Sequence, residues 1–345
     1  MAETESIERI TAIGQALFEA VGAPPPQALC VTDNLVQSSL MGVDSHGVMR
    51  IPEYLELVQQ GSIIPGTDIE IEPTSDSTAI VDCGYNFGVI GAERAMQQAI
   101  ELAKSHRVSS VITRRSNHVG RLGAFVQLAA DAGMIGIATC NSPIYGHFVL
   151  PWGGREGRLA TNPIAYAVPS AADPIVADIS TSVAPEGKVR YHLNENKTLP
   201  TGWIVDAAGQ PSTNAQDFYG PPRGGILPLG ANAGHKGYAL GLLVEILGSA
   251  LAGVSSTDRE TVGNGVCFIV LNPAAFLPEQ RFRELVSETI AYMKSSPPAE
   301  GFSEVFVPGE IEFRCRRERL QTGIPIDPAT REKIRAEMVR LGVTV

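Results

Sequence analysis

The chain has 345 residues, of which 44% are hydrophobic and 19% charged, so a sizeable core can form and disorder is not expected. Its formal net charge of −10 argues against nucleic-acid binding, because an acidic surface repels phosphate backbones. Five dispersed cysteines without a C-x-x-C pair favour free thiols over disulfides or a zinc site. The acidic start and the lack of a long apolar run predict neither a signal peptide nor a membrane span, so we expect a cytoplasmic protein.

The N-terminal part is predicted to be helical. Apolar residues at helical spacing indicate a helix over Ser6 to Val21, which Pro24-Pro25-Pro26 ends. Two further helical patterns run from about Gln27 to Leu40 and from Val48 to about Gln60. This part of the chain therefore predicts a helical cap.

Later in the chain, strands and helices are predicted to alternate. The predicted strands are 78–83, 109–113, 134–140, 164–168, 175–179 and 266–271. The predicted helices are 92–106, 122–132, 237–251, 282–294 and 328–341. Helix 237–251 is apolar on nearly every face and is therefore predicted to be buried. The alternation favours a layered α/β core.

The segment Gly42 to Gly47 is the first candidate for chemistry. His46 lies there between two helices, where an imidazole can exchange a proton near neutral pH, and Ser45 can form a hydrogen bond beside it. Arg50 and Tyr54 follow at four-residue steps, so an intact helix would place all three on one face, and Arg50 could bind a substrate carboxylate. The alternative is that Asp44 only caps the helix and His46 is a surface residue.

Three further segments carry weaker signals. His118 follows a predicted strand, and ligands of α/β proteins gather at the carboxyl ends of strands; alternatively it only shapes the turn. The segment Gly234-His235-Lys236-Gly237 precedes a helix, whose N-terminus attracts phosphate, although an ordinary helix entry would look the same. The hydroxyls of Ser180, Thr181 and Ser182 could bind a ribose or a phosphate, or satisfy their own turn.

Several common signatures are absent from the sequence. It contains no G-x-G-x-x-G after a strand, no Walker loop, no G-x-S-x-G elbow and no H-E-x-x-H. The six histidines are dispersed, so no metal site is expected. Pattern alone therefore indicates an α/β enzyme with two histidine-bearing loops.

Taken together and in order, these segments resemble the malate/L-lactate dehydrogenase family, which is distinct from the Rossmann-type lactate and malate dehydrogenases. That family also includes ureidoglycolate and sulfolactate dehydrogenases, diketogulonate reductase and piperideine-2-carboxylate reductase. The matching stretches are 43–47 with 50–52 and Tyr54, 116–118, 151–154, 161–165, 178–182, 187–188 and 234–237. The resemblance spans roughly Gly42 to Gly323. Two positions depart from it: Arg121 stands where many relatives have small or aromatic residues, which is expected to alter substrate fit, and Ala160 stands where glycine is usual.

The resemblance implies an α/β fold with a three-layer core, a mixed sheet and a non-Rossmann dinucleotide-binding site. It implies that 1–75 with 311–345 form a helical cap with substrate and dimer contacts, and that 76–310 form the nicotinamide-binding core. It further implies a homodimer whose active site lies near the interface, a small carboxylate substrate, and NAD or NADP as cofactor.

Site residues can be carried over by position. His46, His118 and Ser45 match the catalytic residues, and Arg50 and Tyr54 match the substrate side. The positions that match cofactor contacts are Ser180, Thr181, Ser182, His235, Lys236, Pro308, Gly309 and Glu310.

We therefore expect an NAD(P)-dependent dehydrogenase acting on the CH–OH group of a 2-hydroxy acid (EC 1.1.1 type), with His46 or His118 transferring the proton. One alternative within the family is a reductase of a cyclic imine carboxylate. Alternatives of other classes are a non-catalytic dinucleotide-binding sensor and, with little support from the scattered histidines, a zinc hydrolase.

Overall fold

The computed structural model describes residues 3–258 and 263–345, so Met1 and Ala2 at the acidic start lie outside the described residues. Its centre is a seven-stranded sheet of order β2-β3-β4-β11-β5-β6-β7. The strands are β2 (Glu70–Ser75), β3 (Thr78–Asp82), β4 (Val108–Arg114), β5 (Ile135–Cys140), β6 (Ile164–Val168), β7 (Ile175–Ile179) and β11 (Val266–Leu271). The sheet is mixed, because β3 and β4 are parallel and the other neighbours are antiparallel.

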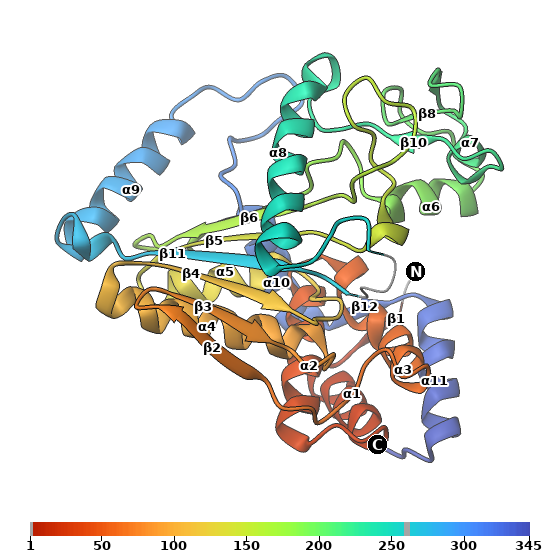
Figure 1. The fold of residues 1–345 in the computed structure, drawn as a ribbon, viewed down its shortest axis with the longest axis horizontal. Helices are drawn as coiled ribbons and strands as arrows, with labels where there is room; N and C mark the ends of the chain where they lie inside the picture. Colours follow the sequence, from red (N-terminus) through yellow and green to blue (C-terminus); the bar gives the residue numbers. More distant parts are fainter. Residues whose placement is uncertain (1–2, 259–262) are drawn as a thin grey trace.

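Helices cover both faces of this sheet, which gives the three-layer core that we expected (Figure 1). On one face lie α4 (Gly88–His106) and α5 (Leu122–Asp131), and on the other lies α8 (Gly234–Gly248). Alternating burial along β4 and β5 matches strands whose side chains point to opposite faces.

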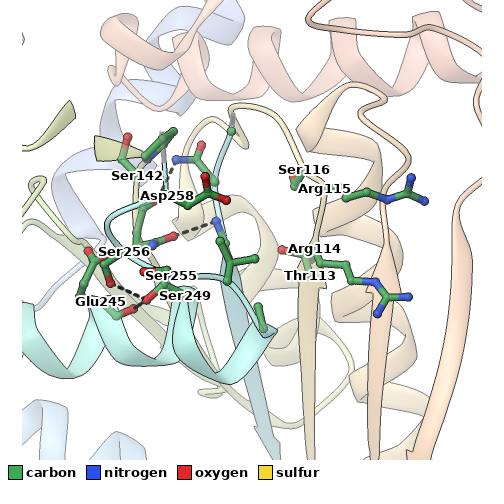
Figure 2. Close-up of a pocket in the computed structure, with 18 of the residues that line it drawn as sticks. Thr113, Arg114, Arg115, Ser116, Ser142, Glu245, Ser249, Ser255, Ser256 and Asp258 are labelled. Carbon is green, nitrogen blue, oxygen red and sulfur yellow. Dashed lines mark hydrogen bonds between the residues drawn. The ribbon is translucent and has the colours of Figure 1, made fainter. Parts of the chain in front are cut away.

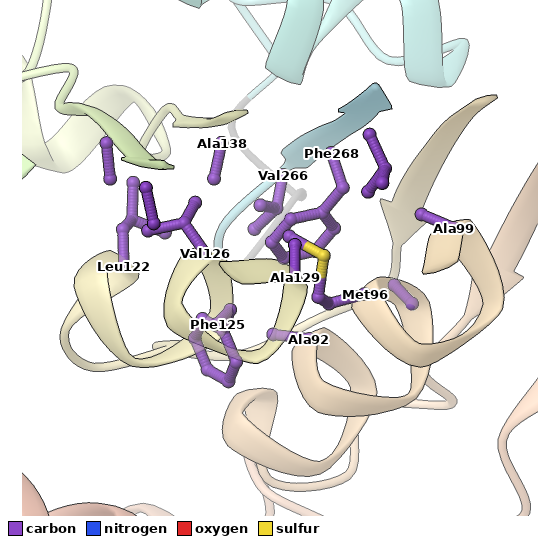
Figure 3. Packing of buried hydrophobic residues seen from close by; sticks show 14 of the residues in the cluster. Ala92, Met96, Ala99, Leu122, Phe125, Val126, Ala129, Ala138, Val266 and Phe268 are labelled. Atoms are coloured by element: carbon purple, nitrogen blue, oxygen red, sulfur yellow. The ribbon is translucent and has the colours of Figure 1, made fainter. Parts of the chain in front are cut away.

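The main hydrophobic core lies between the sheet and the helices α4 and α5. Figure 3 shows Met96 of α4 and Phe125 of α5 meeting Val266 and Phe268 of β11. The rings of Phe125 and Phe268 pack edge to face, with centroids 6.0 Å apart. This packing fixes the carboxyl end of β4 and the start of α5, between which His118 lies.

A helical cap forms a second core beside the sheet. It contains α1 (Ile7–Ala20), α2 (Pro25–Leu40), α3 (Ile51–Gln59) and the C-terminal α11 (Pro328–Leu341). The strands β1 (Glu3–Glu5) and β12 (Ile324–Ile326) pair antiparallel and join the two ends of the chain. The predicted cap of N- and C-terminal segments is therefore confirmed.

A third, smaller cluster surrounds a short sheet of order β10-β8-β9, which the sequence did not predict. Its elements are β8 (Ile204–Val205), β9 (Pro211–Ser212), β10 (Gly225–Ile226), α6 (Glu186–Asn194) and α7 (Ala215–Tyr219). The remaining helices are α9 (Glu279–Lys294) and α10 (Glu310–Thr322). No helix of the described residues is both long enough and apolar enough to cross a membrane.

The prediction that helix 237–251 is buried is wrong. The helix α8 spans Gly234–Gly248, and Leu240, Leu243 and Ile246 are 42%, 49% and 48% exposed. Only one side, which carries glycines, Val244 and Glu245, faces the protein. A helix that is apolar all round normally has neighbours all round, but among residues 3–258 and 263–345 this one has them on one side only.

Candidate active site

The loop between α2 and α3 carries Ser45 and His46, and contacts on two sides hold it in place. Gly47 lies so close to Ser39 that a side chain there would collide with the serine hydroxyl, which accepts a hydrogen bond from the Val48 N–H at 3.0 Å. On the other side, Asp44 forms an ion pair with Arg319 of α10, with N–O distances of 2.5 and 3.1 Å. The Arg319 pairing shows that Asp44 links this loop to the C-terminal part of the chain.

The structure brings the two candidate histidines together. The rings of His46 and His118 are stacked, with centroids 5.5 Å apart and planes inclined by 18°. Ser45 Oγ lies 3.0 Å from His46 Nδ1, and the Tyr54 hydroxyl lies 2.7 Å from His118 Nδ1. Because each Nδ1 has a hydrogen-bonding neighbour, the orientations of both rings are fixed. Each Nε2 atom can then take part in proton transfer.

The surroundings of the pair favour neutral imidazoles. Burial, followed by the positive charges of Arg50 and Arg121, lowers the pKa of His46 to about 4. Burial, with the charge of Arg50 and the neighbouring His46, also lowers the pKa of His118 well below its usual value. Burial raises the pKa of Tyr54, so its hydroxyl keeps its proton. At neutral pH this group of side chains can therefore accept a proton from a bound hydroxyl group.

Arg50 lies beside this pair but is already partly engaged. Its Nε donates a hydrogen bond to the Ser45 carbonyl at 2.7 Å, and its Nη1 pairs with Glu53 at 2.5 and 2.8 Å. Among the described residues, no group bonds to Nη2. Arg50 thus supports the Ser45 backbone and retains one donor for a ligand.

A cavity of about 380 Å³ opens next to His46. It unites the histidine loop with the end of β7 and the start of α10, which lie far apart in the sequence. Its lining includes Ser45, His46, Arg121, Thr161, Asp178, Ser180, Lys188, Gly309 and Glu312. Two expected catalytic residues and two expected cofactor residues therefore share one cavity, whose volume is typical of a small-molecule site.

Other predicted cofactor residues do not line this cavity. Thr181 and Ser182 are buried, and their hydroxyls donate to backbone carbonyls, Thr181 to Thr161 and Ser182 to Ala184. His235 and Lys236 are exposed in the first turn of α8, where the His235 ring meets Trp152 with centroids 5.6 Å apart.

Two more of the expected cofactor residues have structural contacts. The Pro308 carbonyl accepts a hydrogen bond from the Val176 N–H at 3.1 Å. Glu310 pairs with Lys294 at 2.7 Å. These two contacts attach the start of α10 to β7 and α9.

Several charged residues of the cavity were not among the site residues predicted from the sequence. Arg121, Asp178, Lys188 and Glu312 all line it. Arg121 was noticeable only as a departure from the family pattern, and Asp178 and Lys188 only as members of matching stretches. Periodicity could not identify Glu312, because it lies on a helix of mixed polarity.

A buried carboxylate, Glu245, holds the segment that begins with Thr161. Its two oxygens accept hydrogen bonds from the side-chain amides of Asn141 at 3.1 Å and Asn162 at 3.0 Å. Asn162 has a φ of +37°, which few residues other than glycine adopt without such support. Figure 2 shows Glu245 on α8 next to Ser249, in a narrow pocket of about 40 Å³. A charged residue within the long apolar stretch of this helix was the available signal for this network.

The fold and site define an α/β enzyme with a paired-histidine centre, and comparisons give the family. Residues 6–335 match the model of the malate/L-lactate dehydrogenase family. The chain is 36% identical over 336 residues to malate dehydrogenase from Pyrococcus horikoshii, covering 94% of this chain and 91% of that protein. The chain belongs to this family, whose named members include 2-hydroxy acid dehydrogenases.

Solved structures agree with that assignment. Sulfolactate dehydrogenase from Methanocaldococcus jannaschii superposes with a TM-score of 0.90 and 33% identity, covering 99% of this chain and 98% of that one. Delta1-piperideine-2-carboxylate reductase from Pseudomonas syringae superposes with a TM-score of 0.84 and 28% identity, covering 97% and 99%. The family therefore contains both hydroxy-acid dehydrogenases and an imine reductase.

The dehydrogenase family implies a nicotinamide cofactor, and the cavity has groups that suit one. The Ser180 hydroxyl and the Lys188 ammonium provide a hydrogen-bonding group and a positive charge, which match the ribose and phosphate chemistry of a dinucleotide. Among the described residues no cluster of three or more histidine, cysteine or acidic side chains could hold a metal ion.

Proposed function

We propose that the chain is an NAD(P)-dependent dehydrogenase that interconverts small 2-hydroxy and 2-oxo acids. The observation that carries the proposal is the stacked pair of His46 and His118 beside a cavity that also contains Ser180 and Gly309. This reaction needs a proton-transferring group and residues that hold the cofactor, and the residues that we propose for these two roles line the same cavity.

The proposed chemistry assigns the proton to the histidine pair. A bound nicotinamide supplies or accepts the hydride at C2 of the substrate. His46 lines the cavity and His118 does not, so we assign proton transfer at the C2 oxygen to His46. Ser45 sets its ring orientation through Nδ1, and His118 packs behind it with Tyr54 fixing its own ring.

Substrate and cofactor are proposed to approach from different sides. The free donor of Arg50 would bind the carboxylate next to C2. The cofactor side would comprise Ser180, Thr181 and Ser182, the 308–310 segment and, toward its far end, His235 and Lys236 on the first turn of α8. The two buried hydroxyls would act by shaping the backbone there.

We also propose that two copies associate through α8. Leu240, Leu243 and Ile246 form an exposed apolar face on this helix, and burial of such a face stabilises association. A second copy is the occupant that the family resemblance implies.

The domain division, 1–75 with 311–345 against 76–310, remains a prediction. A cytoplasmic location is proposed because all five cysteines are free thiols.

The proposal is tested by following reduced-nicotinamide absorbance with both cofactors and a panel of 2-oxo acids. We expect turnover with at least one of them, and a loss of about 100- to 10,000-fold in kcat when His46 is replaced by alanine. The same replacement of His118 should cost less, because His118 acts through His46. If both single variants keep near wild-type turnover, the proton-transfer assignment is wrong.

A second candidate is a reductase of cyclic imine carboxylates, which the structural similarity to delta1-piperideine-2-carboxylate reductase favours. The same assay with preformed cyclic imines separates the two, because a hydroxy-acid dehydrogenase should turn over the 2-oxo acid faster. Dinucleotide binding without any turnover would instead favour a non-catalytic sensor.

A further inference from the structure

Arg121 presents a buried positive charge to the active-site cavity. It immediately precedes α5, its exposed fraction is 6%, and it lines the same cavity as His46. A side chain at Gly123 would lie 2.5 Å from Arg121 Nη1 and 3.3 Å from its guanidinium carbon. The glycine therefore leaves the space in which the guanidinium lies.

This guanidinium has no partner in the described part of the chain. Its Nε is fully buried without a hydrogen bond, and no carboxylate there forms an ion pair with it. The carboxylates of Asp178 and Glu312 act on its charge without forming an ion pair with it, and Asp178 instead accepts the Gly123 N–H at 2.8 Å. An unpaired buried charge is costly. The presence of the Arg121 guanidinium beside a cavity therefore points to an anionic ligand that binds there and is released.

The position of Arg121 differs from that of Arg50. Arg121 lines the cavity together with His46, whereas Arg50 is not among the lining residues. Arg50 also contacts the backbone of Ser45, while Arg121 lies at the start of α5 next to Asp178. The two cations therefore occupy different parts of the site, Arg50 on the histidine loop and Arg121 in the cavity wall at the start of α5.

We propose that Arg121 binds a second acidic group at the far end of the substrate, so that this chain selects 2-hydroxy and 2-oxo acids with two negative charges. The proposal rests on the proposed function. It makes Arg121 a specificity-determining residue, because a neutral substrate end would leave the buried guanidinium unpaired and lose a charge-assisted bidentate contact.

The test compares two nearly isosteric substrates, 2-oxobutanedioate and its 4-amide, in wild type and in Arg121→Gln. We expect kcat/KM of the dianion to fall by about 10- to 100-fold in Arg121→Gln, the usual effect of losing a hydrogen bond to a charged group. The value for the amide should stay within about threefold, and Arg121→Lys should keep part of the preference. The matched control is Arg281→Gln, which removes an exposed charge on α9 and should change neither value.

The remaining outcomes separate a failure of the Arg121 proposal from a failure of the proposed function. An equal loss for both substrates would assign Arg121 to the shared carboxylate, and a raised Kd for the reduced dinucleotide alone would assign it to a cofactor phosphate. If wild type turns over no 2-oxo acid, the proposed function fails. Thermal protection of the dinucleotide complex by succinate then decides the Arg121 proposal: protection that Arg121→Gln abolishes supports it, and protection that persists overturns it.

Discussion

The titration of His46 is the property of this site that can be worked out in most detail. Burial and two neighbouring guanidinium groups lower its pKa from 6.5 to about 4. At 1.36 kcal/mol for each pKa unit, the folded protein favours the neutral ring by about 3 kcal/mol more than water does. Because burial is the main cause, replacing Arg50 by methionine should raise the pKa only part of the way toward 6.5.

The assay is NMR of protein labelled at the histidine Cε1 carbons, with the His46 signal assigned by its loss in His46→Gln. We expect a midpoint near pH 4 in wild type, a higher one in Arg50→Met, and no change in the control Arg281→Gln. A midpoint near 6.5 in wild type would refute the electrostatic reasoning.

The same pKa fixes the sign of two pH dependences. Because the pKa of His46 is lower in the folded state, the unfolded chain binds more protons between about pH 4 and 6.5. The free energy of unfolding should therefore decrease as the pH falls through that window. In the direction of hydroxy-acid oxidation, the neutral base should be available throughout the neutral range, so kcat/KM should fall only toward pH 4.

Three further changes test other parts of the site. Tyr54→Phe removes the hydroxyl 2.7 Å from His118 Nδ1, so unfolding free energy should fall by about 1 kcal/mol in urea titrations and turnover should fall with it; unchanged turnover would remove Tyr54 from the mechanism. Glu245→Ala removes the carboxylate that accepts from both the Asn141 and Asn162 side-chain amides, and it should cost about 3 kcal/mol in the same titrations, whereas a cost below about 1 kcal/mol would contradict the bracing role. Leu243→Asp should convert a dimer to a monomer in light scattering, and an unchanged mass would exclude this face as the interface.

The elements that could be predicted from the sequence are those whose packing requires apolar residues at a regular spacing. The strand at Val108–Arg114 and the helix α5 bury alternate residues and one helical face respectively, so local periodicity is enough to identify them. The strands β8, β9 and β10 have two residues each, which is too short for any pattern to be recognised. Burial of α8 could not be inferred either, because apolar residues all round a helix do not say which neighbours cover it.

The histidine centre was partly predictable for a similar reason. Ser45, His46 and Arg50 lie within one short segment, so their proximity follows from the chain itself. The contacts of Arg319 with Asp44 and of Glu245 with Asn162 join residues far apart in sequence, and only the fold brings them together. Arg121 was visible as an unusual residue, but its burial without a partner becomes evident only when the cavity wall is assembled.

The central claim is tested most directly by tracing the hydride. Reduced nicotinamide dinucleotide dideuterated at C4 is incubated with wild-type protein and a turned-over 2-oxo acid, and the hydroxy-acid product is analysed by mass spectrometry and NMR. We expect one deuterium at C2 of the product and none elsewhere, and a sharply lower product yield with His46→Ala. A product without deuterium at C2, or equal yields from wild type and His46→Ala, would contradict it.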